Sequence, residues 1–178
     1  MKMAKYLACI CEGGAERAIL DLLLDNHLLN FERDQLIEEA VLRCRSAKEF
    51  ENKYLKKGFR EKITVYRILD SRSENFKLSK AYQPKIDVVN VVTAPEIEML
   101  IIFNEGKYKA FKRSGMKPSI FCKSILKYKE VKSYDFVRQY FADLDTLKNA
   151  MQEYRRVSKV HKNELTLQDL LKLDNPDI

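Results

Sequence analysis

The chain has 178 residues, of which 46% are hydrophobic and 33% are charged, a composition typical of a folded protein with one ordinary core. No apolar stretch approaches the roughly 20 residues of a membrane span, and no cleavage site follows the first apolar run, so we expect a cytoplasmic protein without a membrane partner. The four cysteines lack the paired spacing of a zinc site, which argues against metal–thiolate chemistry.

The formal net charge of +7 indicates an acidic partner, and nucleic acid is the commonest one. Fifteen Lys/Arg and six Asp/Glu lie between Glu105 and Lys162, so the positive charge is concentrated in the C-terminal third. Within this segment, Lys112 and Arg113 are candidate contacts to nucleic-acid phosphates. Aromatic residues are interleaved with the lysines and form either the core of a helical layer or a surface that stacks bases.

The first predicted unit is a strand, a turn and a helix. The uninterrupted apolar run Leu7 to Cys11 predicts a parallel strand covered on both faces, and apolar residues at helical spacing follow up to Leu24. The turn between them carries Glu12 and two glycines, Gly13 and Gly14, which are candidate phosphate-binding positions. Ligands bind at the carboxyl ends of strands in open α/β sheets, so Glu12 stands where chemistry usually occurs.

Three further strands follow in chain order. We expect a helix at 31–39 and a second strand at 40–44, and then a helix from Ala47 to about Lys57 that begins with a Ser46/Glu49 capping box. The β-branched and aromatic run 62–70 is the clearest strand and ends on Asp70. A polar crossover at 71–82 with about two helical turns leads to a fourth strand at 86–92.

The remaining chain reads as helical. Pro95 is expected in the first turn of a helix that contains Glu98, because proline lacks only an amide that is not needed there. Beyond Gly106, helix starts are predicted near 117, 133, 145 and 166. The fold class is therefore α/β, a small parallel sheet of about four strands flanked by helices, with a helical C-terminal extension. We divide the chain into an α/β core at 1–104 and a basic helical extension, packed on that core, at 105–178.

Acidic residues follow the strands at positions that a parallel sheet brings to one edge. Glu12, Asp70 and Glu98 form this set, and clustered carboxylates are the ligands by which proteins hold Mg²⁺ or Mn²⁺. The alternative is structural: Glu12 and Glu98 cap helices and Asp70 merely ends a strand. Glu16 lies in the first helical turn, and we interpret it as a partner of the helix dipole.

The same residues resemble the TOPRIM fold of topoisomerases, primases and OLD-type nucleases, a Rossmann-like α/β arrangement. Within that fold the RloB-like branch, associated with restriction and anti-phage loci, is the most similar. The resemblance rests on Glu12-Gly13 after an apolar strand, on Asp70 at a later strand end and on Pro95-x-x-Glu98, and it covers Ala4 to Phe103.

The resemblance implies that Glu12 donates or accepts the proton in strand cleavage and that Asp70 and Glu98 are Mg²⁺ ligands. TOPRIM enzymes carry an Asp-x-Asp motif, but here Arg72 stands in place of the second aspartate. Arg72 either weakens divalent-ion binding by repulsion or holds a phosphate through its fork of donors. Glu74 is a candidate metal ligand that compensates for the missing second aspartate if the loop after Asp70 bends back.

Three functional hypotheses remain open. The first is a Mg²⁺- or Mn²⁺-dependent nuclease or phosphodiester-transfer protein that acts on nucleic acid in phage defence or a mobile element, with a protein partner from a defence locus. The second is a catalytically degenerate TOPRIM-like module that binds nucleic acid or regulates a complex. The third, a small nucleotide-binding protein using Gly13 and Gly14, lacks both the GxxxxGK[ST] loop and the GxGxxG fingerprint. The sequence does not assign an oligomeric state.

Overall fold

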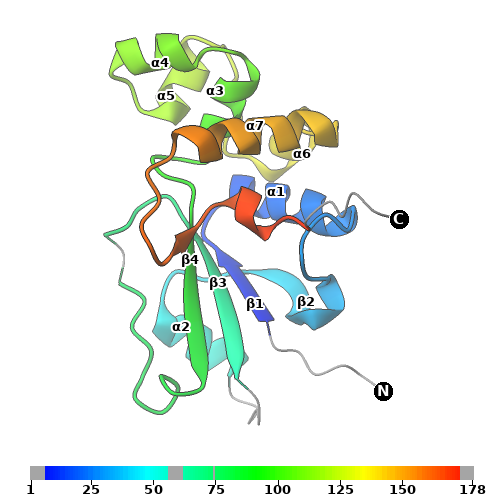
Figure 1. Ribbon diagram of the computed structural model, residues 1–178, viewed down its shortest axis with the longest axis vertical. Helices are drawn as coiled ribbons and strands as arrows, with labels where there is room; N and C mark the ends of the chain where they lie inside the picture. The colour runs from blue at the N-terminus through cyan, green and yellow to red at the C-terminus, as the bar shows by residue number, and fades with distance from the viewer. Residues whose placement is uncertain (1–6, 56–61, 74, 173–178) are drawn as a thin grey trace.

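The structure, a computed structural model, describes residues 7–55, 62–73 and 75–172. It is an α/β fold around a five-stranded parallel sheet of strand order β2-β1-β3-β4-β5, as Figure 1 shows. The strands are β1 (Leu7–Cys11), β2 (Leu36–Arg43), β3 (Ile63–Leu69), β4 (Ile86–Val92) and β5 (Glu164–Leu165). The predicted fold class is confirmed, and a fifth strand is added to the four that were expected.

Helices cover the sheet and continue beyond it. They are α1 (Gly14–Asp25), α2 (Ala47–Tyr54), α3 (Met99–Asn104), α4 (Tyr108–Ser114), α5 (Pro118–Ser124), α6 (Tyr134–Tyr140) and α7 (Leu144–Val157), with 3₁₀ turns η1 (Arg33–Gln35) and η2 (Leu167–Leu170). The predicted starts agree with caps seen in the structure: the Ser46 hydroxyl accepts a hydrogen bond from the Glu49 amide at 3.1 Å, and the Ser133 hydroxyl accepts one from the Phe136 amide at 3.0 Å. No helix in the described ranges has the length and apolar character needed to cross a bilayer.

The region 31–43 differs from its prediction. The helix expected at 31–39 is wrong: a short 3₁₀ turn, η1, ends at Gln35 and β2 then begins at Leu36 rather than at residue 40. Leu36 is fully buried and pairs with Leu7 of β1, so strand pairing outweighs the local helical pattern. Glu38 and Glu39 take positive φ values of 56° and 51° where the pairing register shifts, which lets the strand bulge before it pairs again.

Two other local predictions are also corrected. The crossover at 71–82 contains turns and no helix in its described residues. Pro95 does not start a helix either, because α3 begins at Met99. The preceding residues form tight turns instead, in which the Met99 amide donates to the Glu96 carbonyl at 3.2 Å and the Leu100 amide donates to the Ile97 carbonyl at 3.0 Å.

Two hydrophobic clusters lie on the sheet. The larger one joins α1 to α3 and to the C-terminal helices, and the smaller one joins β1 and β3 to α2 and the crossover. Phe111 and Phe121 belong to the larger cluster, with ring centroids 5.6 Å apart in an edge contact. The Tyr128 and Tyr140 hydroxyls donate to Glu105 Oε1 at 2.8 and 2.6 Å. These four aromatic residues therefore serve packing rather than an exposed stacking surface.

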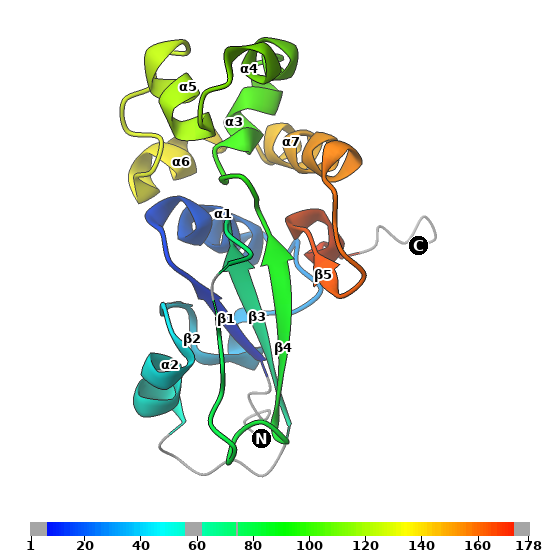
Figure 2. The same ribbon diagram turned by 90° about the vertical axis from the view of Figure 1, so that its left-hand side faces the viewer.

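The C-terminal third is tied to the sheet as well as packed above it. Figure 2 shows the helices α3 to α7 gathered beyond the carboxyl ends of the central strands. β5 extends the sheet through pairs of Asn90 with Glu164 and of Val91 with Leu165. The Tyr154 hydroxyl of α7 donates to the Ala94 carbonyl at 2.7 Å, so α7 holds the segment that links β4 to α3.

Candidate functional site

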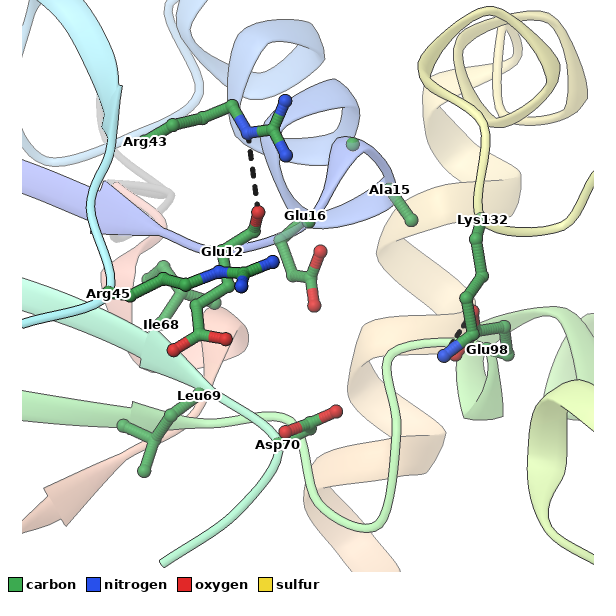
Figure 3. A pocket seen from close by; sticks show the side chains of 12 residues that line it. Glu12, Ala15, Glu16, Arg43, Arg45, Ile68, Leu69, Asp70, Glu98 and Lys132 are labelled. Atoms are coloured by element: carbon green, nitrogen blue, oxygen red, sulfur yellow. Dashed lines mark hydrogen bonds and ion pairs between the residues drawn. The ribbon is translucent and has the colours of Figure 1, made fainter. Parts of the chain in front are cut away.

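A charged pocket of about 270 Å³ lies at the carboxyl ends of β1 and β3, beside the start of α1 (Figure 3). Strand order explains why it forms there: β1 and β3 are neighbours, so the residues that follow them meet at one edge. Its lining includes four carboxylates, two glycines and three cations, namely Glu12, Glu16, Asp70, Glu98, Gly13, Gly14, Arg43, Arg45 and Lys132. The structure thus brings the three predicted carboxylates, Glu12, Asp70 and Glu98, to one pocket.

Glu16 is a pocket residue rather than only a partner of the helix dipole. Its carboxylate folds back over Gly13, in the space that a Cβ at position 13 would need. Burial raises the pKa of Glu16, and the charge of nearby Asp70 raises it further. In Figure 3, Glu12, Glu16 and Asp70 turn toward one common space. Three acidic side chains therefore share this part of the pocket.

Glu98 lies on the opposite side of the pocket and is only 3% exposed. Burial raises the pKa of its carboxyl group to about 7, and the carboxylates of Glu96 and Glu16 act in the same direction. Lys132 opposes them, with Nζ 3.8 Å from Glu98 Oε1 and 3.7 Å from Glu96 Oε1. A carboxyl group with a pKa near neutrality can give or take a proton, so Glu98 is a candidate acid or base in addition to a candidate ligand.

Arg43, Arg45 and Lys132 provide positive charge that sequence reasoning missed. Arg43 ends β2 and its Nε donates to the Glu12 carbonyl at 3.3 Å, while Arg45 follows two residues later. The charge count drew attention to the C-terminal third, whereas two of the three pocket cations come from the N-terminal half. The available signal was the Arg-x-Arg spacing at a strand end, which places both side chains at the ligand-binding edge.

The two glycines of the turn have packing roles. A Cβ on Gly13 would meet the Glu16 carboxylate, as noted above, and a Cβ on Gly14 would lie 3.2 Å from the Lys132 carbonyl and 3.3 Å from the Tyr134 amide. Gly14 therefore lets the loop before α6 approach α1 closely, which places Lys132 at the pocket. Both glycines line the pocket, and their role in phosphate binding stays a prediction.

Three predicted site residues that the structure describes, Arg72, Lys112 and Arg113, do not line the pocket. Arg72 donates to both carboxylate oxygens of Glu164, at 2.8 and 2.9 Å, and to the Lys159 carbonyl at 2.8 Å. Arg72 thus joins the segment that follows β3 to β5. Lys112 and Arg113 are exposed on α4, away from the pocket lining. Glu74 lies outside the described residues.

The donor chemistry of the pocket fits a hard divalent cation in one respect. Carboxylate oxygens are the ligands that Mg²⁺ prefers, and Glu12, Glu16 and Asp70 supply them. Within the described ranges, however, no group of three or more His, Cys, Asp or Glu side chains is close enough together to hold an ion. A metal here would be held by one or two carboxylates, with water and substrate phosphate completing its ligands, as is common for Mg²⁺.

Comparison with known proteins finds no matching family model, curated protein or solved structure. The class of protein is therefore described from its fold and its pocket alone. The chain is a parallel α/β protein with a mixed carboxylate and cation pocket at the carboxyl edge of its sheet.

Proposed function

We propose that the protein is a Mg²⁺- or Mn²⁺-dependent nuclease or phosphodiester-transfer enzyme that acts on nucleic acid in the cytoplasm. The supporting observation is that Glu12, Glu16 and Asp70 share one pocket with three cations. Its resemblance to RloB-like TOPRIM proteins suggests phage defence or a mobile element as the setting, with a protein partner from the same locus. The proposal combines that resemblance with a pocket whose charges suit a phosphodiester.

In this proposal the cationic and the acidic residues of the pocket have different roles. Arg43, Arg45 and Lys132 bind and orient the anionic phosphodiester. Asp70, with Glu16 beside it, would hold the metal ion, which when bound polarises a phosphoryl oxygen. Glu12 transfers the proton at the attacking or leaving oxygen, the role that the resemblance implies.

A cleavage assay tests the proposal. Labelled single- and double-stranded DNA and RNA are incubated with the protein and Mg²⁺ or Mn²⁺. We expect Glu12→Gln to lower cleavage by about a hundredfold or more, the usual range for loss of an acid–base group. Asp70→Asn removes a proposed metal ligand and should lower cleavage by a comparable factor. Matched controls are Glu153→Gln and Asp87→Asn, which alter carboxylates that are 48% and 54% exposed and pair with the surface cations Arg156 and Lys62. Equal activity of the wild type and both pocket variants would contradict the proposal.

A second candidate function is nucleic-acid binding or regulation without catalysis. It is favoured by Arg72, which replaces the second aspartate of the motif and is engaged with Glu164. It is also favoured by the lack of a three-residue metal site among the described residues. This function predicts binding that weakens with salt, proceeds without cleavage and is unaffected by a chelator.

A further inference from the structure

A cluster of cations and aliphatic side chains covers the α4–α5 region, far along the chain from most of the pocket residues. Residues 106–129 contain eight Lys/Arg and no Asp/Glu. All eight cations are exposed: Lys107, Lys109, Lys112, Arg113, Lys117, Lys123, Lys127 and Lys129. The exposed large hydrophobic residues of the described chain also fall here, namely Met116 (37%), Ile120 (48%) and Ile125 (51%). We call these eleven side chains the basic apolar tip.

The packing of α4 against α5 turns these side chains outward. Figures 1 and 2 show the two helices side by side at the end of the molecule farthest from α2. Phe111 and Phe121 fill the space between them, and Gly115, at φ +64°, makes the turn that joins them. Ile120 lies three residues before Lys123 within α5, so an aliphatic and a cationic side chain share one face of this helix.

We propose that the basic apolar tip binds the surface of an anionic membrane. An exposed apolar group rimmed by charge marks an interaction site, and a Lys-rich face with aliphatic side chains is the pattern of peripheral membrane binding. Seven of the eight cations are lysines, whose compact charges suit a diffuse layer of lipid phosphates. The lysines contact head groups, and Met116, Ile120 and Ile125 enter the boundary with the acyl chains. This binding is peripheral and requires no membrane-spanning helix, but it departs from the expectation, drawn from the sequence, that the protein has no membrane partner.

Other partners fit the tip less well. Base stacking needs exposed aromatic faces, but Phe111 and Phe121 are buried and the Tyr128 hydroxyl is hydrogen-bonded to Glu105. A second copy of the chain would place eight cations against eight others. Protein interfaces are depleted in lysine and enriched in aromatic residues and arginine, the opposite of this surface.

Sedimentation with lipid vesicles tests the proposal on the full chain. The probes are vesicles of phosphatidylcholine alone and of phosphatidylcholine mixed with phosphatidylglycerol. We expect binding to the anionic vesicles only. The triple variant Lys112→Gln/Lys117→Gln/Lys123→Gln should bind about a hundredfold more weakly, at about fivefold per charge. The double variant Ile120→Ser/Ile125→Ser, which keeps every charge, should lose about tenfold or more.

A matched control separates local charge from net charge. Lys48→Gln/Lys77→Gln/Lys80→Gln removes three exposed lysines near α2, at the far end of the molecule, and should bind the vesicles like the wild type. Asp70→Asn should also bind like the wild type, because the pocket takes no part in this contact. Circular dichroism and thermal unfolding check that each variant is folded.

Three results would overturn the proposal. One is failure of the wild type to bind anionic vesicles. Another is vesicle binding that the isoleucine substitutions leave unchanged, because attraction would then be by charge alone. The third is loss of nucleic-acid binding in the tip lysine variant while its vesicle binding stays like that of the wild type, which would make the tip a nucleic-acid surface.

Discussion

Replacing Glu98 by glutamine should stabilise the protein at alkaline pH. Glu98 is 3% exposed, and burial raises the pKa of its carboxyl group from an ordinary 4.5 to about 7. Below about pH 4.5 the carboxyl group is neutral in both the folded and unfolded chains. As the pH rises from 4.5 to 7 the unfolded chain ionises first, so the free energy of unfolding falls. Glutamine has the shape of the neutral group and does not titrate.

The size of the effect follows from the pKa difference. The interval from 4.5 to about 7 corresponds to about 3 kcal/mol at 1.36 kcal/mol per pH unit. The attraction of Lys132 is already included, because it lowers the pKa of Glu98. We therefore expect Glu98→Gln to gain about 2 to 3 kcal/mol relative to the wild type between pH 5 and pH 8.

Urea unfolding at pH 5 and pH 8 measures this gain. The quantity compared is the difference between variant and wild type, which cancels the titration of other groups. Glu153→Gln, an exposed carboxylate paired with Arg156, is the control and should show no such pH dependence. A difference between Glu98→Gln and the wild type that stays constant from pH 5 to pH 8, or that falls, would refute the reasoning.

Two further substitutions test the contacts that build the site. Gly14→Ala places a Cβ 3.2 Å from the Lys132 carbonyl and 3.3 Å from the Tyr134 amide. We therefore expect the free energy of unfolding, measured by thermal unfolding, to fall by about 1 kcal/mol. Unchanged stability would show that the loop before α6 moves away without cost. Arg72→Lys keeps the positive charge but removes the paired hydrogen bonds that the guanidinium donates to Glu164. Because Arg72 is 35% exposed and solvent screens the pair, we expect the free energy of unfolding to fall by about 1 kcal/mol at pH 7. Arg72 holds the pKa of Glu164 at about 2, so this loss should be full above pH 4.5 and shrink as the pH falls toward 2, and a loss independent of pH would contradict it.

The sequence predicted most of the sheet because its inner strands are continuous apolar or β-branched runs. β1, β3 and β4 lie where those runs predicted them. β5 was missed because Glu164 and Leu165 carry no such pattern, and only pairing with Asn90 and Val91 of β4 makes them a strand. The mistaken helix at 31–39 has the same origin, since pairing with β1 overrides local preference there.

The sequence predicted the edge of the sheet at which the pocket carboxylates gather, but not every charged side chain that lines the pocket. A parallel sheet places residues that follow neighbouring strands at one edge, and this rule brought Glu12 and Asp70 together correctly. The rule does not give side-chain direction, so Glu16, which folds back over Gly13, was assigned to the helix dipole. Lys132 could not be predicted either, because a loop contact with Gly14 brings it from a distant part of the chain.

Because β5 lies far along the chain from β4, the sheet cannot be completed until late in synthesis. When β4 leaves the ribosome its outer edge has no partner, because Glu164 and Leu165 are still to be made. Tyr154, which holds the segment after β4, and Lys132, which lines the pocket, also arrive late. An unpaired strand edge is prone to aggregation, so the nascent chain passes through a vulnerable interval. The pocket gains its full set of charges only once Lys132 has been synthesised, so a shorter nascent chain carries an incomplete site.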